Sequence, residues 1–514
     1  MLRPFQWWRE GVIYQAYPRS LADSNGDGIG DLPGLTAHLD HLEWLGVDGL
    51  WLNPIMPSPN RDFGYDVSEY RDVHPELGTL ADLERLVAEA GRRGIRVLLD
   101  LVPNHTSDRH PWFSDPARRD WYVWAEGRDG GPPNNWRSHF GGPAWSFDRK
   151  AGRWYLHQFL PEQPDLNWWS KGVRAEFDSI LRFWFERGIA GFRIDTAALI
   201  VKDRELRDDP PADESDSWWT QRHGIRIVHS GNRPEVHDVL RRWRRICRRF
   251  EPERVLLGET FILDMEQLSR YFAPGELHLA FNFIFVHSPF DPAVLRGRVE
   301  ASEEALPASG WPVWTASNHD LSRFPTRWCQ GDERRIRLAL VMLLTLRGTP
   351  VLYYGDELGM EDVAVAASRL RDRVGLREFG HSSRDPVRTP MPWRDAPGAG
   401  FTRAGVEPWL PIGDLSRNVE SQRADPGSVL HLTRDLNALR RRLADLRRGA
   451  YATLPAPDGV WLFRRGRRTL VGLNFSEQPR PLGVAGQVLL SSHRSREGRR
   501  VGALEPLEGL VLEA

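Results

Sequence analysis

Three acidic residues end short apolar segments of the kind that form buried strands: Asp195, Glu259 and Asp320. Arg193 precedes Asp195 by two positions, and side chains two apart on a strand point to the same side. A cation beside a carboxylate keeps it ionised and therefore nucleophilic. Taken alone, this Arg–Asp pair is more typical of a structural ion pair at a strand end. The presence of two more carboxylates at strand ends, Glu259 and Asp320, favours a catalytic role for Asp195 instead.

Glycoside hydrolysis with retention uses one carboxylate as nucleophile and one carboxylic acid as proton donor, about 5 Å apart. Adjacent barrel strands, about 4.8 Å apart, can provide that separation. We therefore predict that Asp195 is the nucleophile. Glu259 has no neighbouring cation in the sequence, which favours the raised pKa of a general acid. His105 and His319, at two further strand ends, are expected to bind sugar hydroxyls rather than to be satisfied core histidines.

The elements that must position these residues form an alternating pattern. Eight short apolar segments alternate with helical patterns, at 12–15, 49–54, 95–100, 188–195, 255–259, 279–283, 314–320 and 351–355. This order predicts an α/β fold, a closed parallel (β/α)8 TIM barrel, whose site lies at the carboxyl ends of the strands. Helical spacing of apolar residues is clearest at 35–45, 80–92, 173–186, 334–346 and 430–446.

Two regions depart from the barrel pattern. Residues 106–170 are rich in Pro, Gly, Trp and Asn, which predicts an irregular insertion after the third strand. From about residue 451, short alternating apolar runs predict a small antiparallel β domain. The predicted division is a barrel at 1–105 and 171–447, an inserted domain at 106–170, and a C-terminal domain at 448–514.

Composition excludes several classes of function. The 69 Lys and Arg residues balance 70 Asp and Glu residues, so charge offers no argument for a nucleic-acid or membrane partner. Cys247 and Cys329 are far apart and in no metal or redox spacing, so buried free thiols are expected. The longest apolar run, 338–346, is too short to span a membrane, and residues 1–10 do not read as a signal peptide. A cytoplasmic enzyme is the simplest expectation.

The stretch 23–31 has oxygen ligands at alternate positions and a glycine, Gly28, at its sixth position. The side chains of Asp23, Asn25, Asp27 and Asp31, with the carbonyl of Ile29, match the front of a calcium loop. The glutamate that closes an EF-hand is missing, because Gly34 holds its position. A short structural calcium loop is predicted, with magnesium as a second possible ion and an Asp/Asn/Gly-rich turn as the alternative.

Several motifs in order resemble the α-amylase family of retaining glycosidases, glycoside hydrolase family 13. They are Asp-Leu-Val-Pro-Asn-His at 100–105, Gln-Pro-Asp-Leu-Asn at 163–167, Gly-Phe-Arg-Ile-Asp at 191–195, Gly-Glu at 258–259, and Asn-His-Asp at 318–320. The resemblance extends from about residue 10 to the C-terminus. It implies Asp195 as nucleophile, Glu259 as acid/base, and Asp320 as the carboxylate that stabilises the distorted sugar. The implied lining of the glucose subsite is Asp62, Tyr65, His105, Arg193 and His319.

Exo-acting α-glucosidases of this family show a further resemblance. In them, an aspartate after the second strand pairs with a late arginine and closes the pocket behind the terminal glucose; here these would be Asp62 and Arg417. The resemblance implies removal of one terminal glucose at a time from short oligosaccharides or small α-glucosides. Thr196, after the nucleophile, stands where relatives that favour α-1,6 bonds usually have valine, which favours α-1,4 bonds here.

Two alternatives stay open at this point. The same glucosyl–Asp195 intermediate can be captured by a sugar or small alcohol, which would make the chain an α-glucosyltransferase or a sugar isomerase, or add transglycosylation to hydrolysis. A non-catalytic binding or transporter-associated relative is the more remote alternative, because all three carboxylates are present. No organic cofactor is expected, and the sequence does not predict an oligomeric state.

Overall fold

The computed structural model of the protein describes residues 5–307, 309–372 and 383–514. Eight parallel strands lie side by side in the order β10-β11-β1-β2-β3-β7-β8-β9, and a parallel bridge between Phe281 and Val313 joins the two ends. The predicted TIM barrel is confirmed. Its strands are β1 (Ile13–Ala16), β2 (Gly49–Leu52), β3 (Arg96–Leu101), β7 (Gly191–Ile194), β8 (Val255–Gly258), β9 (Leu279–Ala280), β10 (Val313–Trp314) and β11 (Thr349–Tyr353).

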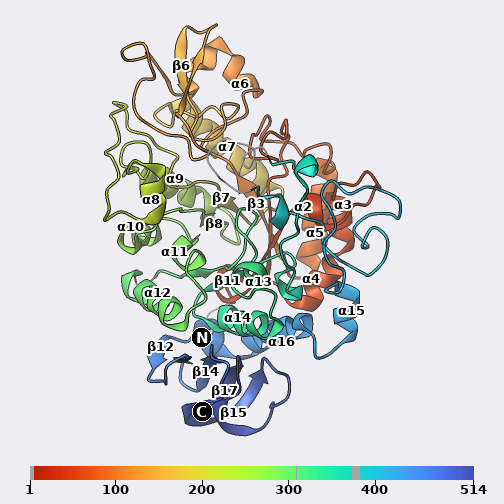
Figure 1. The fold of residues 1–514 in the computed structure, drawn as a ribbon. Helices are drawn as coiled ribbons and strands as arrows, with labels where there is room; N and C mark the ends of the chain where they lie inside the picture. Colours follow the sequence, from red (N-terminus) through yellow and green to blue (C-terminus); the bar gives the residue numbers. More distant parts are fainter. Residues whose placement is uncertain (1–4, 308, 373–382) are drawn as a thin grey trace.

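Helices surround the barrel (Figure 1). The main ones are α3 (Leu32–Ala37), α4 (Leu39–Leu45), α5 (Leu80–Arg92), α7 (Lys171–Glu186), α9 (Val236–Cys247), α12 (Pro292–Ala305), α14 (Glu333–Thr345) and α16 (Val429–Arg442). The segment predicted as one helix at 35–45 is two helices that meet at His38, and α16 is followed by a separate α17 (Ala444–Arg448). Shorter helices include α1 (Trp7–Glu10), α2 (Pro18–Leu21), α6 (Pro111–Ser114), α8 (Trp218–His223), α10 (Met265–Ser269), α11 (Phe283–Val286), α13 (Phe324–Arg327) and α15 (Val419–Ala424).

The interior of the barrel is packed with side chains, which hold the strand ends in place. Its buried cluster takes one or more residues from most strands and includes Ile13, Trp51, Leu98, Leu257, Leu279, Val313 and Val351. Strands β7 and β8 approach closely at Gly191, where a Cβ atom would lie 2.2 Å from the carbonyl oxygen of Val255. Only glycine fits there, and the close approach fixes β7 against β8 just before their functional residues.

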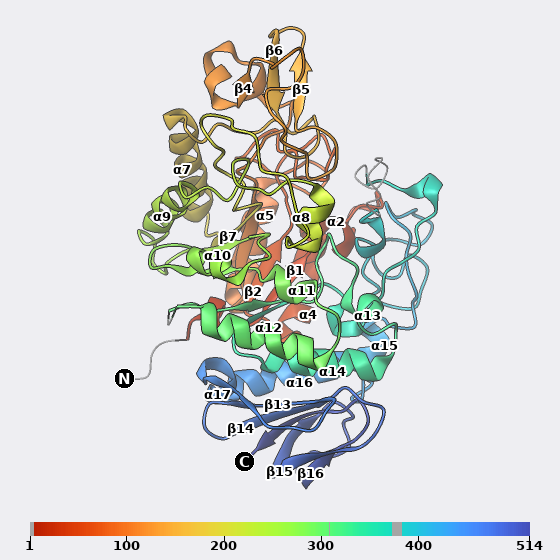
Figure 2. The same cartoon turned by 60° about the vertical axis from the view of Figure 1, so that its left-hand side comes forward.

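Two antiparallel sheets lie at opposite ends of the molecule (Figures 1 and 2). Within the stretch 106–170, β4 (Trp124–Ala125), β6 (Arg153–Leu156) and β5 (Trp145–Asp148) pair in that order. The C-terminal sheet has the order β12-β13-β14-β17-β15-β16 and lies against α14 and α16. Its strands are β12 (Tyr451–Leu454), β13 (Val460–Arg465), β14 (Thr469–Asn474), β15 (Arg480–Ser491), β16 (Arg500–Leu504) and β17 (Gly509–Glu513).

Candidate active site

Arg193 lies at the centre of the candidate site, at the end of β7. Its Nη1 atom donates hydrogen bonds of 2.7 Å to Asp100 Oδ1 and 2.7 Å to Asp195 Oδ1. Its Nη2 atom lies 2.9 Å from Glu259 Oε2. The three carboxylates come from the ends of β3, β7 and β8, which are neighbours in the barrel. The predicted same-side placement of Arg193 and Asp195 is confirmed.

The electrostatics correct one part of the sequence reasoning. Glu259 has no neighbouring cation in the sequence, but in the structure the guanidinium of Arg193 reaches it from the adjacent strand. Burial raises the pKa of Asp195 well above its ordinary value; Arg193 opposes this, while Glu259 and Asp100 add to it. Burial also raises the pKa of Asp100 to about 6. Arg193 therefore does not by itself select Asp195 as the ionised carboxylate.

Three carboxyl groups on one guanidinium leave an excess of negative charge in a buried place, so the cluster favours retention of a proton. A retained proton beside an ionised carboxylate is the combination that glycoside hydrolysis requires. Glu259 has a further donor, because the backbone N–H of Thr196 donates to its Oε2 at 2.8 Å. Thr196 itself has the left-handed backbone angle φ = 43°, a strained conformation that is common at functional sites.

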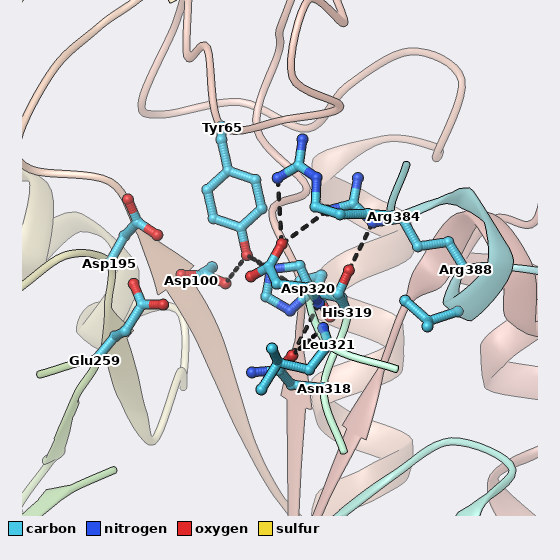
Figure 3. Close-up of polar contacts among 12 residues, drawn as sticks. Tyr65, Asp100, Asp195, Glu259, Asn318, His319, Asp320, Leu321, Arg384 and Arg388 are labelled. Atoms are coloured by element: carbon cyan, nitrogen blue, oxygen red, sulfur yellow. Dashed lines mark hydrogen bonds and ion pairs between the residues drawn. The ribbon is translucent and has the colours of Figure 1, made fainter. Parts of the chain in front are cut away.

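Asp320 is the third predicted carboxylate and follows β10 in a turn. Arg388 Nη2 lies 3.0 Å and Arg384 Nη1 3.2 Å from Asp320 Oδ1, and His319 Nε2 lies 3.0 Å from its Oδ2 (Figure 3). Burial alone would raise the pKa of Asp320, but the charged Arg384 and Arg388 beside it hold that pKa well below its ordinary value. Asp320 is thus an ionised acceptor, suited to sugar hydroxyl groups.

Tyr65 connects the groups around Asp320 with those around Arg193. Its hydroxyl donates to Asp100 Oδ2 at 3.0 Å and lies 2.7 Å from His319 Nε2. Burial lowers the pKa of His319 well below its ordinary value, so this ring is a neutral hydrogen-bonding group. Figure 3 shows Tyr65 between Asp195 on one side and His319 on the other.

Asp62 has a different arginine partner from the one predicted. Arg384 Nη2 donates to Asp62 Oδ1 at 2.6 Å, whereas Arg417 donates to the carbonyl oxygens of Gly359 and Gly331 at 2.6 and 2.8 Å. The predicted Asp62–Arg417 pair is therefore wrong. The guanidinium of Arg417 instead bonds to backbone carbonyl oxygens at the ends of a turn and a helix, away from the candidate site.

Sequence reasoning missed four residues of this site: Asp100, Gln163, Arg384 and Arg388. Gln163 Nε2 donates to Asp62 Oδ2 at 3.2 Å and lies 3.2 Å from His105 Nε2. Asp100 and Gln163 stand inside motifs already singled out. Arg388 opens the Arg-Thr-Pro-Met-Pro-Trp stretch at 388–393, which also resembles the exo-acting α-glucosidases, and Arg384 lies four positions before it. The sequence shows where these four residues stand in the chain, but it does not show which side chains they contact.

A cavity of about 370 Å³ brings the predicted residues together. Its walls include all three candidate catalytic carboxylates and five predicted substrate-binding residues, Asp62, Tyr65, His105, Thr196 and His319, together with Arg384. Arg193 is not part of the wall: it lies buried behind the carboxylates and makes the contacts described above. Burial lowers the pKa of His105 to about 4, which keeps that ring neutral in the cavity wall.

The loop at 23–31 forms a network of its own hydrogen bonds. Asp23 accepts from the N–H groups of Gly26 and Gly28, and Asp31 accepts from that of Gly34. Among the residues that the structure describes, no three His, Cys, Asp or Glu side chains are grouped to hold a metal ion. A carboxylate has about four lone-pair sites, so these turn contacts leave oxygen atoms for an ion, and calcium binding stays a prediction.

Comparison with known proteins agrees with this geometry. Residues 15–449 match the family model described as the alpha amylase catalytic domain. The chain belongs to the alpha-amylase family. It is 42% identical to a probable alpha-glucosidase of Rhizobium meliloti (strain 1021), over 86% of this chain and 84% of that protein. It is 37% identical to an oligo-1,6-glucosidase of Parageobacillus thermoglucosidasius, over 92% and 91%.

A solved structure in the same family is also similar. The crystal structure of the alpha-glucosyl transfer enzyme XgtA superposes with a TM-score of 0.92 at 37% identity and covers 99% of this chain and 100% of that one. The chain is thus an enzyme, a glycoside hydrolase of the alpha-amylase family, rather than a non-catalytic binding or transporter-associated relative. Across the described residues, no helix has the length and apolar character needed to cross a membrane.

Proposed function

We propose that the protein is a retaining, exo-acting α-glucosidase that removes terminal α-linked glucose from short oligosaccharides or small α-glucosides. We call the cavity of about 370 Å³ the glucose cavity. The observation that carries this proposal is the pair of ionic contacts at one end of it. Arg384 bonds to Asp62 at 2.6 Å and to Asp320 at 3.2 Å, and it lies only 11% exposed. A cavity that is filled behind the terminal sugar suits removal of single units rather than internal cleavage of a long chain.

The proposed chemistry uses the two carboxyl groups that share Arg193. Asp195 attacks the anomeric carbon of the glucose, the glycosidic bond breaks, and Glu259 gives its proton to the departing oxygen. Water then attacks the glucosyl ester of Asp195, and Glu259 takes a proton from that water, so both groups return to their initial states. Asp320 accepts hydrogen bonds from ring hydroxyls of the distorted sugar, and the neutral His105 and His319 donate or accept beside it.

Thr196 supports the proposal of α-1,4 preference. Its side chain lines the cavity beside Glu259, where the bond to be cut must lie. A relative of 37% identity is named an oligo-1,6-glucosidase, so the linkage has to be measured. Single side-chain differences in an apolar pocket discriminate by only about 1–3 kcal/mol.

The deciding experiment measures initial rates on maltose, isomaltose, sucrose, trehalose and a nitrophenyl α-glucoside. NMR at early times identifies which anomer of glucose the enzyme releases. Release of α-glucose, with maltose cut faster than isomaltose, is the expected result. Release of β-glucose would contradict retention, and internal cleavage of longer maltodextrins would contradict exo action.

Transfer of glucose is the second candidate function. It is supported by the similarity to a protein described as an alpha-glucosyl transfer enzyme. Transfer and hydrolysis would share the glucosyl–Asp195 intermediate and differ in whether water or another hydroxyl compound attacks it. Incubation with maltose and analysis of early products for new glucosides distinguishes the two.

A further inference from the structure

Lys202 is a buried cation that the proposed chemistry does not use. It lies in the loop after β7, and its side chain is only 3% exposed. Its Nζ atom donates to Asn104 Oδ1 at 2.5 Å and lies 2.9 Å from Asp165 Oδ2. Burial lowers the pKa of Lys202, but the carboxylate of Asp165 opposes this. Buried ion pairs are often no more stabilising than apolar side chains of similar volume, so stability alone does not account for this one.

The two charges determine which way round the amide of Asn104 lies. An ammonium group has three donors and no acceptor, so the atom of Asn104 that faces Lys202 is its oxygen. The amide nitrogen lies on the other side and donates to Asp165 Oδ1 at 3.3 Å. An amide turned by half a rotation would set its N–H groups against the ammonium and its oxygen against the carboxylate. The Lys202–Asp165 pair therefore holds Asn104 in one orientation.

The orientation of Asn104 determines where His105 carries its proton. The amide nitrogen of Asn104 lies 3.2 Å from His105 Nδ1. Because that amide nitrogen is a donor, Nδ1 must be the acceptor, and the proton of the neutral ring is on Nε2. The backbone carbonyl oxygen of Tyr65 lies 3.1 Å from Nε2 and accepts from it. The tautomer with its proton on Nε2 thus accounts for both contacts.

A second donor competes for the same ring. Gln163 Nε2 lies 3.2 Å from His105 Nε2, and its amide is fixed, because Gln163 Oε1 accepts from the N–H of Leu160 at 3.0 Å. A neutral imidazole has one acceptor nitrogen, so the amides of Asn104 and Gln163 cannot both donate to it. With the proton on Nδ1, Gln163 would donate to Nε2, and Asn104 and Tyr65 would lose their contacts. An Asn104 amide that turned freely would leave both tautomers populated.

The nitrogen that carries the proton faces the glucose cavity. His105 lines that cavity, and its Nε2 atom lies beside Gln163, which donates to Asp62 at the filled end. Nδ1 is turned toward Asn104, which is fully buried. An N–H at Nε2 donates to a sugar oxygen, whereas Nε2 without its proton can only accept.

We propose that Lys202 and Asp165 are positioning residues: they orient Asn104, which keeps the proton of His105 on Nε2, and that N–H donates to a hydroxyl oxygen of the terminal glucose. This inference rests on the proposed function for the identity of the sugar. The tautomer itself can be observed without substrate and without turnover, so the two can fail separately.

Long-range proton–nitrogen NMR on protein with ¹⁵N-labelled histidine reads the tautomer, and the variant His105→Gln identifies the signals of His105. In the native protein at pH 8, Nδ1 should have the shift of an unprotonated ring nitrogen and Nε2 that of an N–H. The double variant Lys202→Met/Asp165→Asn removes both charges together and leaves no unpaired buried charge. Its two ring nitrogens should have intermediate shifts, because both tautomers are then populated.

A matched control for this double variant is Lys171→Met/Asp458→Asn, which makes the same changes at two exposed positions. It should leave the signals of His105 unchanged. A proton on Nδ1 in the native protein would overturn the inference. So would a Lys202→Met/Asp165→Asn protein in which the proton stays on Nε2 alone.

An exchange of two residues links the tautomer to catalysis. Asn104→Asp/Asp165→Asn keeps the number of charges and places a carboxylate beside His105 Nδ1, so the proton should move to Nδ1. The value of kcat/KM for maltose should then fall by about 10- to 100-fold, because a sugar oxygen meets a nitrogen that cannot donate to it. A moved proton with unchanged kcat/KM would show that His105 does not donate to the sugar. The expected NMR shifts in a protein without glucosidase activity would contradict only the proposed function.

Discussion

Arg384 donates a hydrogen bond of 2.6 Å to Asp62, although 322 positions separate the two residues in the chain. The same guanidinium lies 3.2 Å from Asp320, so one side chain joins the loop after β2 to the turn after β10. Removing one partner of a buried ion pair leaves the other charge uncompensated, which typically costs 2–5 kcal/mol. The end of the glucose cavity thus depends on contacts between segments distant in sequence.

The variant Arg384→Met should therefore lower kcat/KM for maltose by about 100-fold or more. Arg417→Met is the matched control, because Arg417 bonds to backbone carbonyls outside the cavity. We expect the control to keep kcat/KM within about threefold once its thermal stability has been checked. A larger loss in the control than in Arg384→Met would restore the pairing that the sequence suggested.

Asp195→Asn should abolish turnover while substrate still binds. The amide keeps the shape of the side chain but is a poor nucleophile, so we expect kcat for maltose to fall by at least about 10³-fold. Calorimetry should still detect maltose binding, because Asp62, Asp320 and Arg384 are untouched. Hydrolysis at a substantial fraction of the original rate would show that another group attacks the sugar.

Glu259→Gln should have an effect that depends on the leaving group. Maltose needs a proton on its departing oxygen, whereas nitrophenolate departs without one, so the loss in kcat/KM should be about 10²- to 10⁴-fold for maltose and much smaller for a nitrophenyl α-glucoside. Steady-state rates on the two substrates provide the comparison. If both substrates suffer equally, Glu259 is not the proton donor.

Asp356 makes stability depend on pH. It begins the 3-10 helix η3 (Asp356–Leu358), and burial raises its pKa from 3.8 to about 7. The folded protein then binds more protons than the unfolded chain between these pH values, so this contribution to stability is fully present below about pH 4 and is lost as the pH rises to about 7. Asp356→Asn cannot ionise and should be more stable than the native protein at pH 8, by at most about 4 kcal/mol.

Thermal unfolding at pH 5 and pH 8 measures this difference, and the advantage of Asp356→Asn should shrink at the lower pH. Asp395→Asn is a suitable control, because Asp395 is exposed, and its effect should be the same at both values. An Asp356→Asn protein that is less stable than the native one at pH 8 would show that the ionised carboxylate is needed there.

Removal of metal tests whether the loop at 23–31 binds calcium. If calcium binds there, as predicted, a chelator should lower the Tm, because calcium at 100 times its Kd stabilises the folded state by about 2.7 kcal/mol. Asp27→Ala, which removes an exposed carboxylate from the loop, should abolish the response to the chelator. An unchanged Tm on chelation would favour the hydrogen-bonded turn without a metal.

The sequence predicted well what local patterns determine. Strand segments such as 255–258 are short, apolar and bounded by polar residues, so the barrel and the neighbouring positions of Asp195 and Glu259 followed from order alone. The contact between Arg193 and Glu259 could not be predicted in this way, because it crosses between strands and depends on how an arginine side chain extends. Arg384 was missed for a related reason: its partners are set by a loop whose path has no periodic signal.

Glu259 belongs to the walls of the glucose cavity and of an adjoining cavity of about 690 Å³, and this arrangement has a kinetic consequence. The Asp62–Arg384 pair fills the far end of the glucose cavity, so the departing aglycone and the incoming water or alcohol use the same space beside Glu259. The first product must leave before the second reactant can bind. Steady-state kinetics with two varied reactants should therefore be ping-pong, with parallel double-reciprocal lines, and an alcohol acceptor at high concentration should compete with the donor for the free enzyme.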